Sequence, residues 1–266
     1  MANLLKISDT HLKLAKFANG EPEIFATVQG EGINTGIPTV FIRLSLCNLR
    51  CRWCDTSYTW NWEGTTFKHK DMKTGKNVKY CPKKEIIELT SIEVMEYISK
   101  VSGPNIHHVV ITGGEPLMHR SSEAFKHLLM LLKSAGYHIE IETNGTLIPD
   151  AYVASLIDQF NVSPKLENSG NSVHARQKDK VYKFFAQCPN TYFKFVVTGK
   201  ADLDEIFKLQ ALYNITAAKI LLMPEGRTDK ETQARAQEIV ELCKQNGYRF
   251  CNRLHVWIWD GALRGV

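Results

Sequence analysis

The chain has 266 residues, of which 44% are hydrophobic and 23% are charged. These proportions are typical of a globular protein and exclude a disordered, collagenous or coiled-coil chain. The length fits one α/β domain over residues 1–266, because such domains often reach about 250 residues. The 33 Lys and Arg exceed the 28 Asp and Glu, giving a net charge of +5 spread along the chain. This small excess suits an anionic substrate or an acidic partner without requiring nucleic acid.

The sequence contains neither a membrane span nor a secretory signal. No window holds the roughly 18–20 consecutive apolar residues that a span needs, and Lys6 and Asp9 interrupt the N-terminal segment. Seven cysteines is an odd number, and Cys47, Cys51 and Cys54 are clustered. This clustering predicts a reducing compartment, the cytoplasm, and a metal site rather than disulfide bonds.

Short runs rich in β-branched and apolar residues predict strands, followed by Gly, Asn or Pro signals. The predicted strands are residues 38–46, 107–112, 138–143, 160–163, 191–198, 218–223 and 248–259. The gaps have helical spacing, which predicts helices over residues 91–101, 121–135, 149–157, 178–187, 202–213 and 229–246. Thr90 and Glu93 have capping-box spacing, and Gly136 and Gly247 lie where helix C-caps are expected.

This alternation predicts a parallel sheet with right-handed crossovers, either an open doubly wound sheet or a full or partial barrel. In both, ligands bind at the carboxyl ends of the strands. Residues 61–84 break the alternation, since they are polar, rich in Lys and contain the turn signal Lys73-Thr74-Gly75-Lys76. We interpret them as an inserted hairpin or mobile loop, and residues 1–20 as an N-terminal extension.

The clustered cysteines have Cys-x3-Cys-x2-Cys spacing directly after a predicted strand. Such short intervals let three thiolates converge on one metal centre from a loop. Three unrelated thiols and a structural zinc site are the alternatives, although zinc normally takes a fourth protein ligand. Three cysteines are what an iron–sulfur cluster uses when one iron stays open for a substrate or cofactor.

With Trp53 directly before the last cysteine, the motif resembles the signature of the radical S-adenosylmethionine superfamily. The resemblance implies a partial TIM-type βα barrel with an open side. It also implies that Cys47, Cys51 and Cys54 hold a four-iron four-sulfur (4Fe–4S) cluster whose free iron binds S-adenosylmethionine. Cleavage of this cofactor gives a 5′-deoxyadenosyl radical, which abstracts hydrogen from the substrate.

The run Thr112-Gly113-Gly114-Glu115-Pro116 follows at a strand end, where two glycines expose backbone and Glu115 offers a hydrogen-bond acceptor to an ammonium group. Alone it fits an ordinary tight turn, but after the cysteine motif it is similar to the superfamily's methionine-binding motif. Short strand-end segments further along match cofactor contacts, with structural turns as the alternative. The implied cofactor contacts are Trp53, Cys54, Asp55, Gly114, Glu115, Ser163, Pro164, Lys165, Met223, Pro224, Glu225 and Gly226.

Three segments are similar to the 7-carboxy-7-deazaguanine synthase family of queuosine and 7-deazapurine biosynthesis: residues 23–32, residues 36–43, and Cys54-Asp55-Thr56. The resemblance implies a lyase that contracts the ring of 6-carboxy-5,6,7,8-tetrahydropterin to 7-carboxy-7-deazaguanine with loss of ammonia. It further implies Mg²⁺ at Thr56. The implied substrate contacts are Val28, Gln29, Gly30, Glu31, Arg43 and Thr112.

These residue types suit that substrate. A pterin ring presents an amide and an amine that Gln29 and Glu31 can pair with, and Arg43 offers a planar fork to the carboxylate. The Thr56 hydroxyl is an oxygen ligand of the kind that Mg²⁺ prefers. A solvated turn for Gln29 and Glu31, an outward-facing strand position for Arg43 and a loop cap for Thr56 are the structural alternatives.

Partners follow from the same resemblance: an electron-donor protein such as a flavodoxin or a ferredoxin, and a second copy of the chain. Trp257 and Trp259 alternate with Ile258, which fits barrel closure or a homodimer interface. We interpret His255, on the last predicted strand, as a packed histidine, with a substrate contact as the alternative. No auxiliary cluster is expected, because the remaining cysteines lack ligand spacing: Cys81, Cys188, Cys243 and Cys251.

Two other functions remain open at this point. A glycyl-radical activating enzyme shares the cysteine motif but acts on a partner protein, and it does not need the run Gln29-Gly30-Glu31-Gly32. A metal-dependent RNA-binding module predicts a basic stripe with stacking aromatic residues. Only residues 68–84 are dense in Lys, and a solvated loop explains them.

Overall fold

The protein is described by a computed structural model, which covers residues 5–70, 75–260 and 264–265. One ten-stranded sheet runs through it in the order β10-β9-β8-β7-β6-β5-β3-β1-β4, with β2 also paired to β3. The strands are β1 (Leu12–Ala15), β2 (Ile24–Val28), β3 (Pro38–Leu44), β4 (Ile86–Leu89), β5 (His108–Gly113), β6 (His138–Thr143), β7 (Gln159–Val162), β8 (Thr191–Val197), β9 (Ile220–Pro224) and β10 (Arg249–Phe250).

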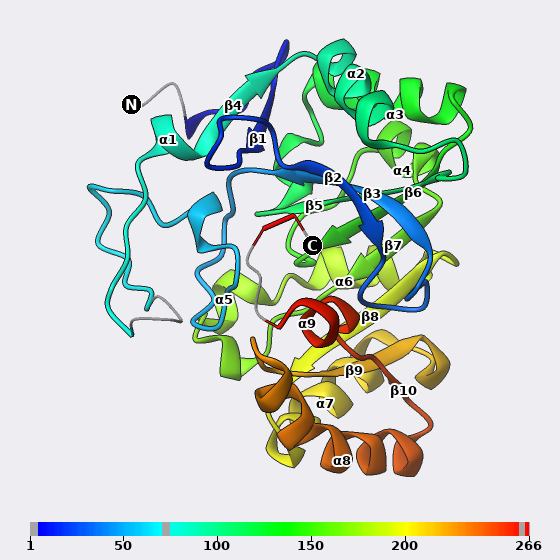
Figure 1. Cartoon of the computed structure of the whole chain (residues 1–266). Helices are drawn as coiled ribbons and strands as arrows, with labels where there is room; N and C mark the ends of the chain where they lie inside the picture. The colour runs from blue at the N-terminus through cyan, green and yellow to red at the C-terminus, as the bar shows by residue number, and fades with distance from the viewer. Residues whose placement is uncertain (1–4, 71–74, 261–263, 266) are drawn as a thin grey trace.

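The sheet is a partial barrel with an open side (Figure 1). Strand β3 pairs in parallel with β5, and β5 to β10 continue this parallel series, as the alternation of strands and helices predicts. Strands β1, β2 and β4 are antiparallel and extend one end of the sheet. Within the described residues, β4 and β10 are the two ends of the sheet and do not pair, so the barrel stays open.

The helices agree closely with the predicted ranges. Thr90 and Glu93 form the expected capping box, and Gly247 ends α8 at φ 68°. The main helices are α2 (Ser91–Val101), α3 (Glu123–Ser134), α4 (Ala151–Leu156), α6 (Asp179–Gln187), α7 (Leu203–Tyr213) and α8 (Asp229–Asn246); the shorter ones are α1 (Pro82–Glu85), α5 (Val173–Arg176) and α9 (Leu254–Trp259).

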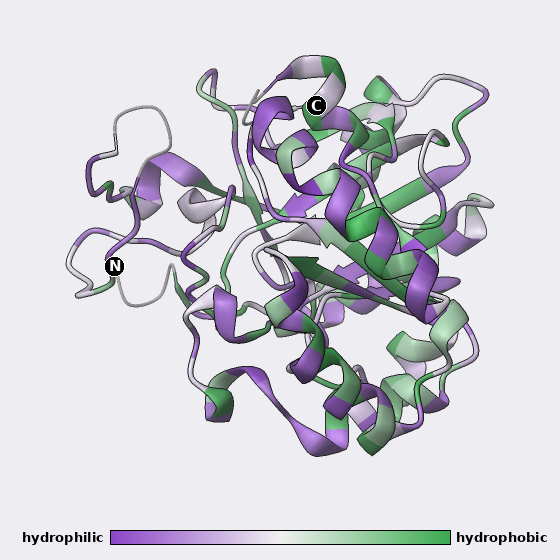
Figure 2. Ribbon diagram, turned by 90° about the horizontal axis from the view of Figure 1, so that it is seen from below, coloured by the Kyte–Doolittle hydropathy of each residue, from purple (hydrophilic) through white to green (hydrophobic). Residues whose placement is uncertain are grey.

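Side chains alternate between the two faces of each central strand. One set of side chains packs against the helices in the main hydrophobic core. In Figure 2 the strands are mostly hydrophobic, and the helices around them also carry hydrophilic stretches. The other set faces the barrel interior and includes several charged or polar side chains: Arg43, Thr112, Glu142 and Lys194. The strand alternation therefore separates a helix-covered core from a polar interior.

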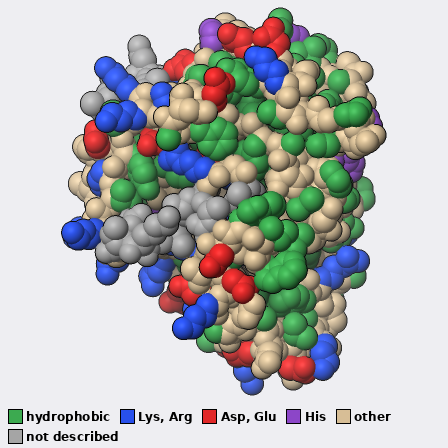
Figure 3. Space-filling view, viewed as in Figure 1, with side chains coloured by type: hydrophobic (Ala, Val, Ile, Leu, Met, Phe, Trp, Pro, Cys, Tyr) green, Lys and Arg blue, Asp and Glu red, His purple; other side chains and the backbone are tan. Residues whose placement is uncertain are grey.

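The C-terminal strand predicted over residues 248–259 is wrong. The segment forms the two-residue β10 and then the helix α9. Apolar residues are nearly continuous there, so the run shows neither strand nor helix periodicity clearly. In α9 only Val256 is buried, while Trp257, Ile258 and Trp259 are exposed. Figure 3 shows hydrophobic side chains at the surface over the position that α9 has in Figure 1.

The N-terminal segment has structure that its polarity did not predict, and the insertion contains isolated bridges. Residues 1–20 contribute β1, which lies between β3 and β4 and is fully buried. In the insertion, residues 61–84, isolated bridges join Trp62 to Tyr80 and Lys70 to Asn77. Lys73 and Thr74 of the predicted turn lie outside the described residues. In the described part of the chain, no helix has the length and apolar character of a membrane span.

Candidate active site

A cavity of about 230 Å³ opens at the carboxyl ends of the parallel strands. It collects nearly all the site residues predicted from the sequence, and only Glu115 and Pro164 do not line it. Those that line it are Val28, Gln29, Gly30, Glu31, Arg43, Cys47, Cys51, Trp53, Cys54, Asp55, Thr56, Thr112, Gly114, Ser163, Lys165, Met223, Pro224, Glu225 and Gly226.

Each of the three clustered thiols has an N–H donor beside it. The backbone N–H of Leu49 lies 3.5 Å from Cys47 Sγ, Asn171 Nδ2 lies 3.2 Å from Cys51 Sγ, and Trp60 Nε1 lies 3.3 Å from Cys54 Sγ. Burial raises the pKa of Cys47 to about 12 and that of Cys51 to about 11. Such buried thiols become thiolates when a metal replaces the proton, and the N–H donors then stabilise the sulfur charge.

This donor set fits an iron–sulfur cluster. Among the residues that the structure describes, no three His, Cys, Asp or Glu side chains share a single metal-ion position. A cluster binds each cysteine through a different iron atom, so it needs thiols around a cup rather than at one point. The cysteine loop, residues 47–54, provides three free thiols that all line one cavity.

Gly113 and Gly114 hold the cysteine loop by close backbone contact. The N–H of Gly114 donates to the carbonyl of Leu44 at 2.9 Å, and the N–H of Glu115 donates to that of Leu46 at 2.8 Å. A Cβ on Gly114 would lie 2.0 Å from the Leu46 carbonyl oxygen. Side chains are therefore excluded here by the neighbouring strand end.

Glu115 lies behind the cavity wall and does not line the cavity itself. Its carboxylate is fully buried and accepts hydrogen bonds from Thr143 Oγ1 at 2.8 Å, from the N–H of Asn144 at 2.6 Å and from the N–H of Leu117. Burial raises its pKa. Glu115 thus joins the ends of β5 and β6 and acts on the cavity through Thr143 and Asn144, which line it.

Ser163, Lys165 and Trp53 also line the cavity, near the cysteines. Lys165 Nζ donates to Ser163 Oγ at 2.7 Å and lies 5.1 Å from the centre of the Trp53 ring. Arg227 Nε donates to the Trp53 carbonyl at 3.2 Å. These contacts fix the indole beside the last cysteine and leave polar groups at the cavity surface.

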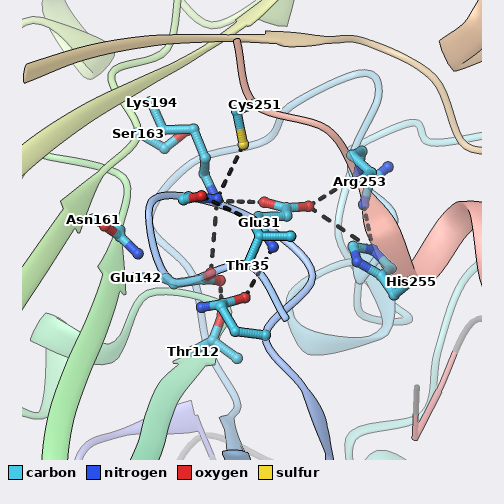
Figure 4. A network of polar contacts seen from close by, with 12 residues as sticks. Glu31, Thr35, Thr112, Glu142, Asn161, Ser163, Lys194, Cys251, Arg253 and His255 are labelled. Carbon is cyan, nitrogen blue, oxygen red and sulfur yellow. Dashed lines mark hydrogen bonds and ion pairs between the residues drawn. The ribbon is translucent and has the colours of Figure 1, made fainter. Parts of the chain in front are cut away.

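Glu31 is the centre of an ionic network (Figure 4). One oxygen accepts a hydrogen bond from Lys194, and the other accepts one from Arg253 Nε at 2.9 Å. Lys194 also lies 3.6 Å from Glu142, which accepts a hydrogen bond from Thr112 at 2.9 Å. Burial alone would raise the pKa of Glu31, but Lys194 and Arg253 together hold it well below its usual range.

Arg253 joins three separate segments at the cavity. Besides Glu31, its Nη2 donates to Asp55 at 2.5 Å and its Nη1 donates to the Gly226 carbonyl at 2.6 Å. The adjacent His255 packs over Gly30, where a Cβ would lie 2.2 Å from its Nδ1, and it also lines the cavity. Burial lowers the pKa of His255 to about 4, so the ring is neutral at pH 7.

Arg43 faces the cavity from β3 with a fixed orientation. Its Nε donates to the fully buried Glu23 at 2.7 Å, and Tyr58 donates to both Glu23 oxygens at 3.0 Å. Burial alone would lower the pKa of Arg43, but Tyr58 and Glu23 raise it further than burial lowers it. The guanidinium is therefore charged, and Glu23 occupies its inner edge.

The Gln29 side chain supports the loop that carries Glu31. It is 1% exposed, donates to Glu140 at 2.6 Å and accepts from the N–H of Glu31 at 3.1 Å. Glu140 also accepts from Asn34 Nδ2 at 2.9 Å. Both ends of the Gln29 amide thus have a partner within the protein, and the residue lines the cavity.

Thr56 lies at the N-cap position of the 3₁₀ helix η2 (Ser57–Thr59), but its side chain makes no capping hydrogen bond. Its hydroxyl is instead 3.6 Å from Cys54 Sγ and lines the cavity. The interpretation of Thr56 as a loop cap is therefore not supported by a capping contact, and the hydroxyl oxygen borders the cavity.

Several residues of the site were not predicted. Lys194 is the one Lys, Arg, Asp or Glu of a predicted strand, and Glu142 is one of two in another; charges in otherwise apolar strands were the signal that could have found them. Arg253 has no such local signal, because its partners Glu31 and Asp55 are distant in the sequence. The other unpredicted lining residues include Phe41, Leu49, Gly113, Thr143, Asn144, Val196, Arg227 and Val256.

Comparisons with known proteins agree with this geometry. The family model of the radical SAM superfamily matches residues 42–184. The chain is 38% identical to a 7-carboxy-7-deazaguanine synthase of Halobacterium salinarum and 33% identical to one of Pyrobaculum aerophilum. The first match covers 90% of both chains, and the second covers 90% of this chain and 94% of its relative.

A solved structure gives the same result. The crystal structure of QueE from Escherichia coli superposes with a TM-score of 0.62 at 26% sequence identity, covering 92% of this chain and 95% of that one. The superfamily uses a 4Fe–4S cluster and S-adenosylmethionine, for which the three cysteines and the adjacent cavity are suited. The chain belongs to the radical SAM superfamily and, within it, to the 7-carboxy-7-deazaguanine synthase family.

Proposed function

We propose that the chain converts 6-carboxy-5,6,7,8-tetrahydropterin to 7-carboxy-7-deazaguanine, with loss of ammonia, in queuosine and 7-deazapurine biosynthesis. The observation that carries this proposal is that Arg43, Glu31 and the three clustered cysteines line one cavity. A carboxylate-binding cation and a hydrogen-bond acceptor for an amine thus lie beside the centre that would start radical chemistry. The relatives of the same family support the assignment.

Arg43 is assigned to the substrate carboxylate. Glu23 holds the Nε edge of the guanidinium, so a carboxylate can approach the two Nη groups as a bidentate ligand. Glu31 and Glu142 are assigned to the amine and amide of the pterin ring, because the carboxyl groups of both can accept hydrogen bonds at the cavity surface. Gln29 is a positioning residue that holds the backbone next to Glu31.

Cys47, Cys51 and Cys54 would hold the 4Fe–4S cluster, and Gly114, Ser163, Lys165 and residues 223–226 would contact S-adenosylmethionine. When bound, cluster and cofactor supply the 5′-deoxyadenosyl radical that abstracts hydrogen from the substrate. The surrounding side chains orient the substrate and exclude water from the cavity. Thr56 is assigned as the protein ligand of Mg²⁺, whose remaining ligands would be water and the substrate carboxylate.

The proposal extends to the assembly and its partners. We propose one domain over residues 1–266, a homodimer that buries the exposed face of α9, and an electron-donor protein such as a flavodoxin or a ferredoxin. Trp257 and Trp259 are 60% and 39% exposed, which supports an interface there. Seven free thiols support a reducing, cytoplasmic location.

The test is anaerobic incubation of cluster-reconstituted, reduced protein with S-adenosylmethionine, Mg²⁺ and 6-carboxy-5,6,7,8-tetrahydropterin, followed by mass analysis. The proposal expects 7-carboxy-7-deazaguanine from the wild type and none from Cys51→Ala. Cys243→Ala, which changes a thiol outside the cavity, is the matched control and retains the product. Formation of 5′-deoxyadenosine without the deazapurine would reject the substrate and favour a protein partner, as in glycyl-radical activating enzymes.

A further inference from the structure

The insertion carries the entire net charge of the chain. By sequence, residues 61–84 contain seven Lys against Glu63 and Asp71, a net charge of +5, which equals the charge of all 266 residues. The rest of the chain is therefore balanced. A short segment with this imbalance creates a positive field that extends over about a Debye length, roughly 8–10 Å at moderate salt, and attracts acidic partners.

The insertion lies against the cysteine loop. The Arg50 guanidinium, between two of the clustered cysteines in sequence, is 4.4 Å from the centre of the Phe67 ring. The His69 ring is 5.6 Å from that of Trp60, and its Nε2 is 3.5 Å from Arg227. In Figure 1 this segment is the light-blue to cyan excursion at the left, and Figure 3 shows Lys and Arg side chains gathered on that side.

A line of aromatic contacts joins this surface to the cysteines. Phe67 is 38% exposed, and its ring centre lies 6.3 Å from that of the buried Trp60. Trp60 in turn donates its indole N–H to Cys54 Sγ at 3.3 Å. Among the residues described in the insertion, Phe67 is the exposed large hydrophobic side chain. A partner that covers Phe67 is therefore separated from Cys54 by Trp60.

The lysines close to Phe67 in sequence or in space differ in their surroundings. Lys68 and Lys70 are exposed on either side of the buried His69. Lys79 lies 5.9 Å from the Phe67 ring centre, and its Nζ donates to Asn61 and Thr65 at 2.8 Å. Together with Arg50, these residues form an apolar centre with a positive rim, the anatomy of a specific protein interface. We name Arg50, Phe67, Lys68, Lys70 and Lys79 the insertion surface.

We infer that the insertion surface docks an acidic one-electron donor protein, which delivers its electron past Trp60 to the cluster. The inference rests on the proposed function, because the cluster must gain one electron before the cofactor can be cleaved. The donor loses the electron that the cluster gains, and no bond forms or breaks in the transfer. A nucleic acid also suits the charge, but one exposed ring beside the cysteine loop favours a redox protein over a row of stacked bases.

The first test measures binding of purified flavodoxin to the cluster-reconstituted protein at low and high salt. The double variant Lys68→Glu/Lys70→Glu is expected to bind about tenfold more weakly at low salt, and the difference is expected to shrink at high salt. The control Lys180→Glu/Lys208→Glu makes the same change of charge on the exposed faces of α6 and α7 and is expected to bind as the wild type does. An equal loss of flavodoxin binding in both double variants, or no loss of binding in either of them, overturns the inference.

A second measurement follows the absorbance of the cluster during reduction. Phe67→Ala and the Lys68→Glu/Lys70→Glu variant are expected to be reduced more slowly by flavodoxin but at the wild-type rate by dithionite, a small reductant that needs no docking surface. Slower reduction by both reagents would mean a disturbed cluster and would overturn the inference. If transfer RNA binds the wild type with the same charge dependence and flavodoxin does not bind, the surface recognises nucleic acid instead.

These outcomes separate the docking surface from the proposed function. Wild-type protein that is reduced by dithionite but makes no 7-carboxy-7-deazaguanine counts against the substrate alone. Flavodoxin binding and cluster reduction do not require the pterin, so they still decide whether the insertion surface receives the donor.

Discussion

Gly113 and Gly114 lie where β5 meets the chain that enters the cysteine loop. A Cβ at Gly113 would be 2.0 Å from the Leu44 carbonyl oxygen, and Gly113 has a φ of 126°. Leu46 itself adopts a φ of 77°, which side-chain-bearing residues rarely do. The backbone of this region is therefore determined by direct contact, and the first thiol follows directly after Leu46.

Gly114→Ala should displace the cysteine loop. Because the new methyl group meets backbone rather than a flexible side chain, we expect the free energy of unfolding to fall by about 2 kcal/mol or more, with reduced iron incorporation. Denaturant unfolding and iron content after reconstitution measure the two effects. Gly103→Ala, with no atom within 4 Å, is the control; an equal loss there would contradict the explanation by contact.

Lys194→Met should destabilise the protein by leaving Glu31 and Glu142 with fewer cations. A broken buried ion pair costs about 3 kcal/mol at pH 7, whereas Lys133→Met, which breaks a surface pair with Asp158, should cost less than about 1 kcal/mol. Glu31 has a lowered pKa when folded, so its stabilisation is present above its ordinary pKa of 4.5 and is lost at lower pH. The free energy of unfolding, measured as a function of pH, should show the difference between the wild type and Lys194→Met narrowing below pH 4.5. A difference that does not change with pH would argue against the ion pair between Lys194 and Glu31.

The residues of the site differ in how visible they are in the sequence. The cysteines were predictable because their intervals are short, and Gly114 because it follows a strand directly. Gln29 lines the cavity, but its partner Glu140 lies 111 residues away, so the hydrogen bond between their side chains was not visible in the sequence. Arg253 was missed for the same reason, since its contact with Glu31 spans 222 residues.

At the scale of elements, two helices begin with the same capping box but lie at different distances from the cavity. Thr90 caps α2, and Thr228 caps α8 directly after Gly226 and Arg227, which line the cavity. We expect Thr90→Ala and Thr228→Ala each to lower the free energy of unfolding by about 1 kcal/mol.

Only Thr228→Ala should also weaken binding of S-adenosylmethionine, because Glu231 of the same capping box accepts from the N–H of Arg227 at 2.7 Å. Equilibrium dialysis of the reconstituted protein with labelled cofactor measures this difference. Weaker binding in both variants would indicate a global effect of stability, and unchanged binding in both would show that the start of α8 does not position the cavity wall.

The elements that were predicted well are those with long, periodic patterns. Residues 91–101, 138–143 and 229–246 match α2, β6 and α8 residue for residue. The failure over residues 248–259 has a physical reason: α9 has only six residues, too few for a 3.6-residue period to repeat. Its position is set instead by a tertiary contact, the hydrogen bond from the N–H of Leu254 to the carbonyl of Gly30 at 2.8 Å.

For the whole molecule, the exposed face of α9 predicts the oligomeric state. Trp257→Ser should shift the proposed homodimer toward monomer in analytical ultracentrifugation, because a large apolar side chain at an interface contributes about 2 kcal/mol or more. Leu212→Ser, which removes a 66% exposed apolar side chain from α7, is the control and should leave the sedimentation unchanged. A wild type that sediments as a monomer would reject the interface.

The general architecture was predictable because seven parallel strands follow a repeated strand–helix pattern. The antiparallel end of the sheet was not, since β1, β2 and β4 are short and are joined by segments without helical spacing. Lys13 of β1 is buried, and its Nζ lies 2.6 Å from a carboxylate oxygen of Glu88 in β4. The charge of Lys13 made the N-terminal segment appear polar in the sequence, although β1 is buried.

The ion pair between Glu31 and Arg253 also has a consequence for synthesis on the ribosome. Glu31 and the cysteine loop are made first, whereas Arg253 follows 222 residues after Glu31. Strands that pair with their neighbours in sequence can form as they emerge. The cavity, however, gains the wall that Arg253 forms only after residue 253 has been made, so a chain that stops before this residue has all three cluster thiols but an open pterin side.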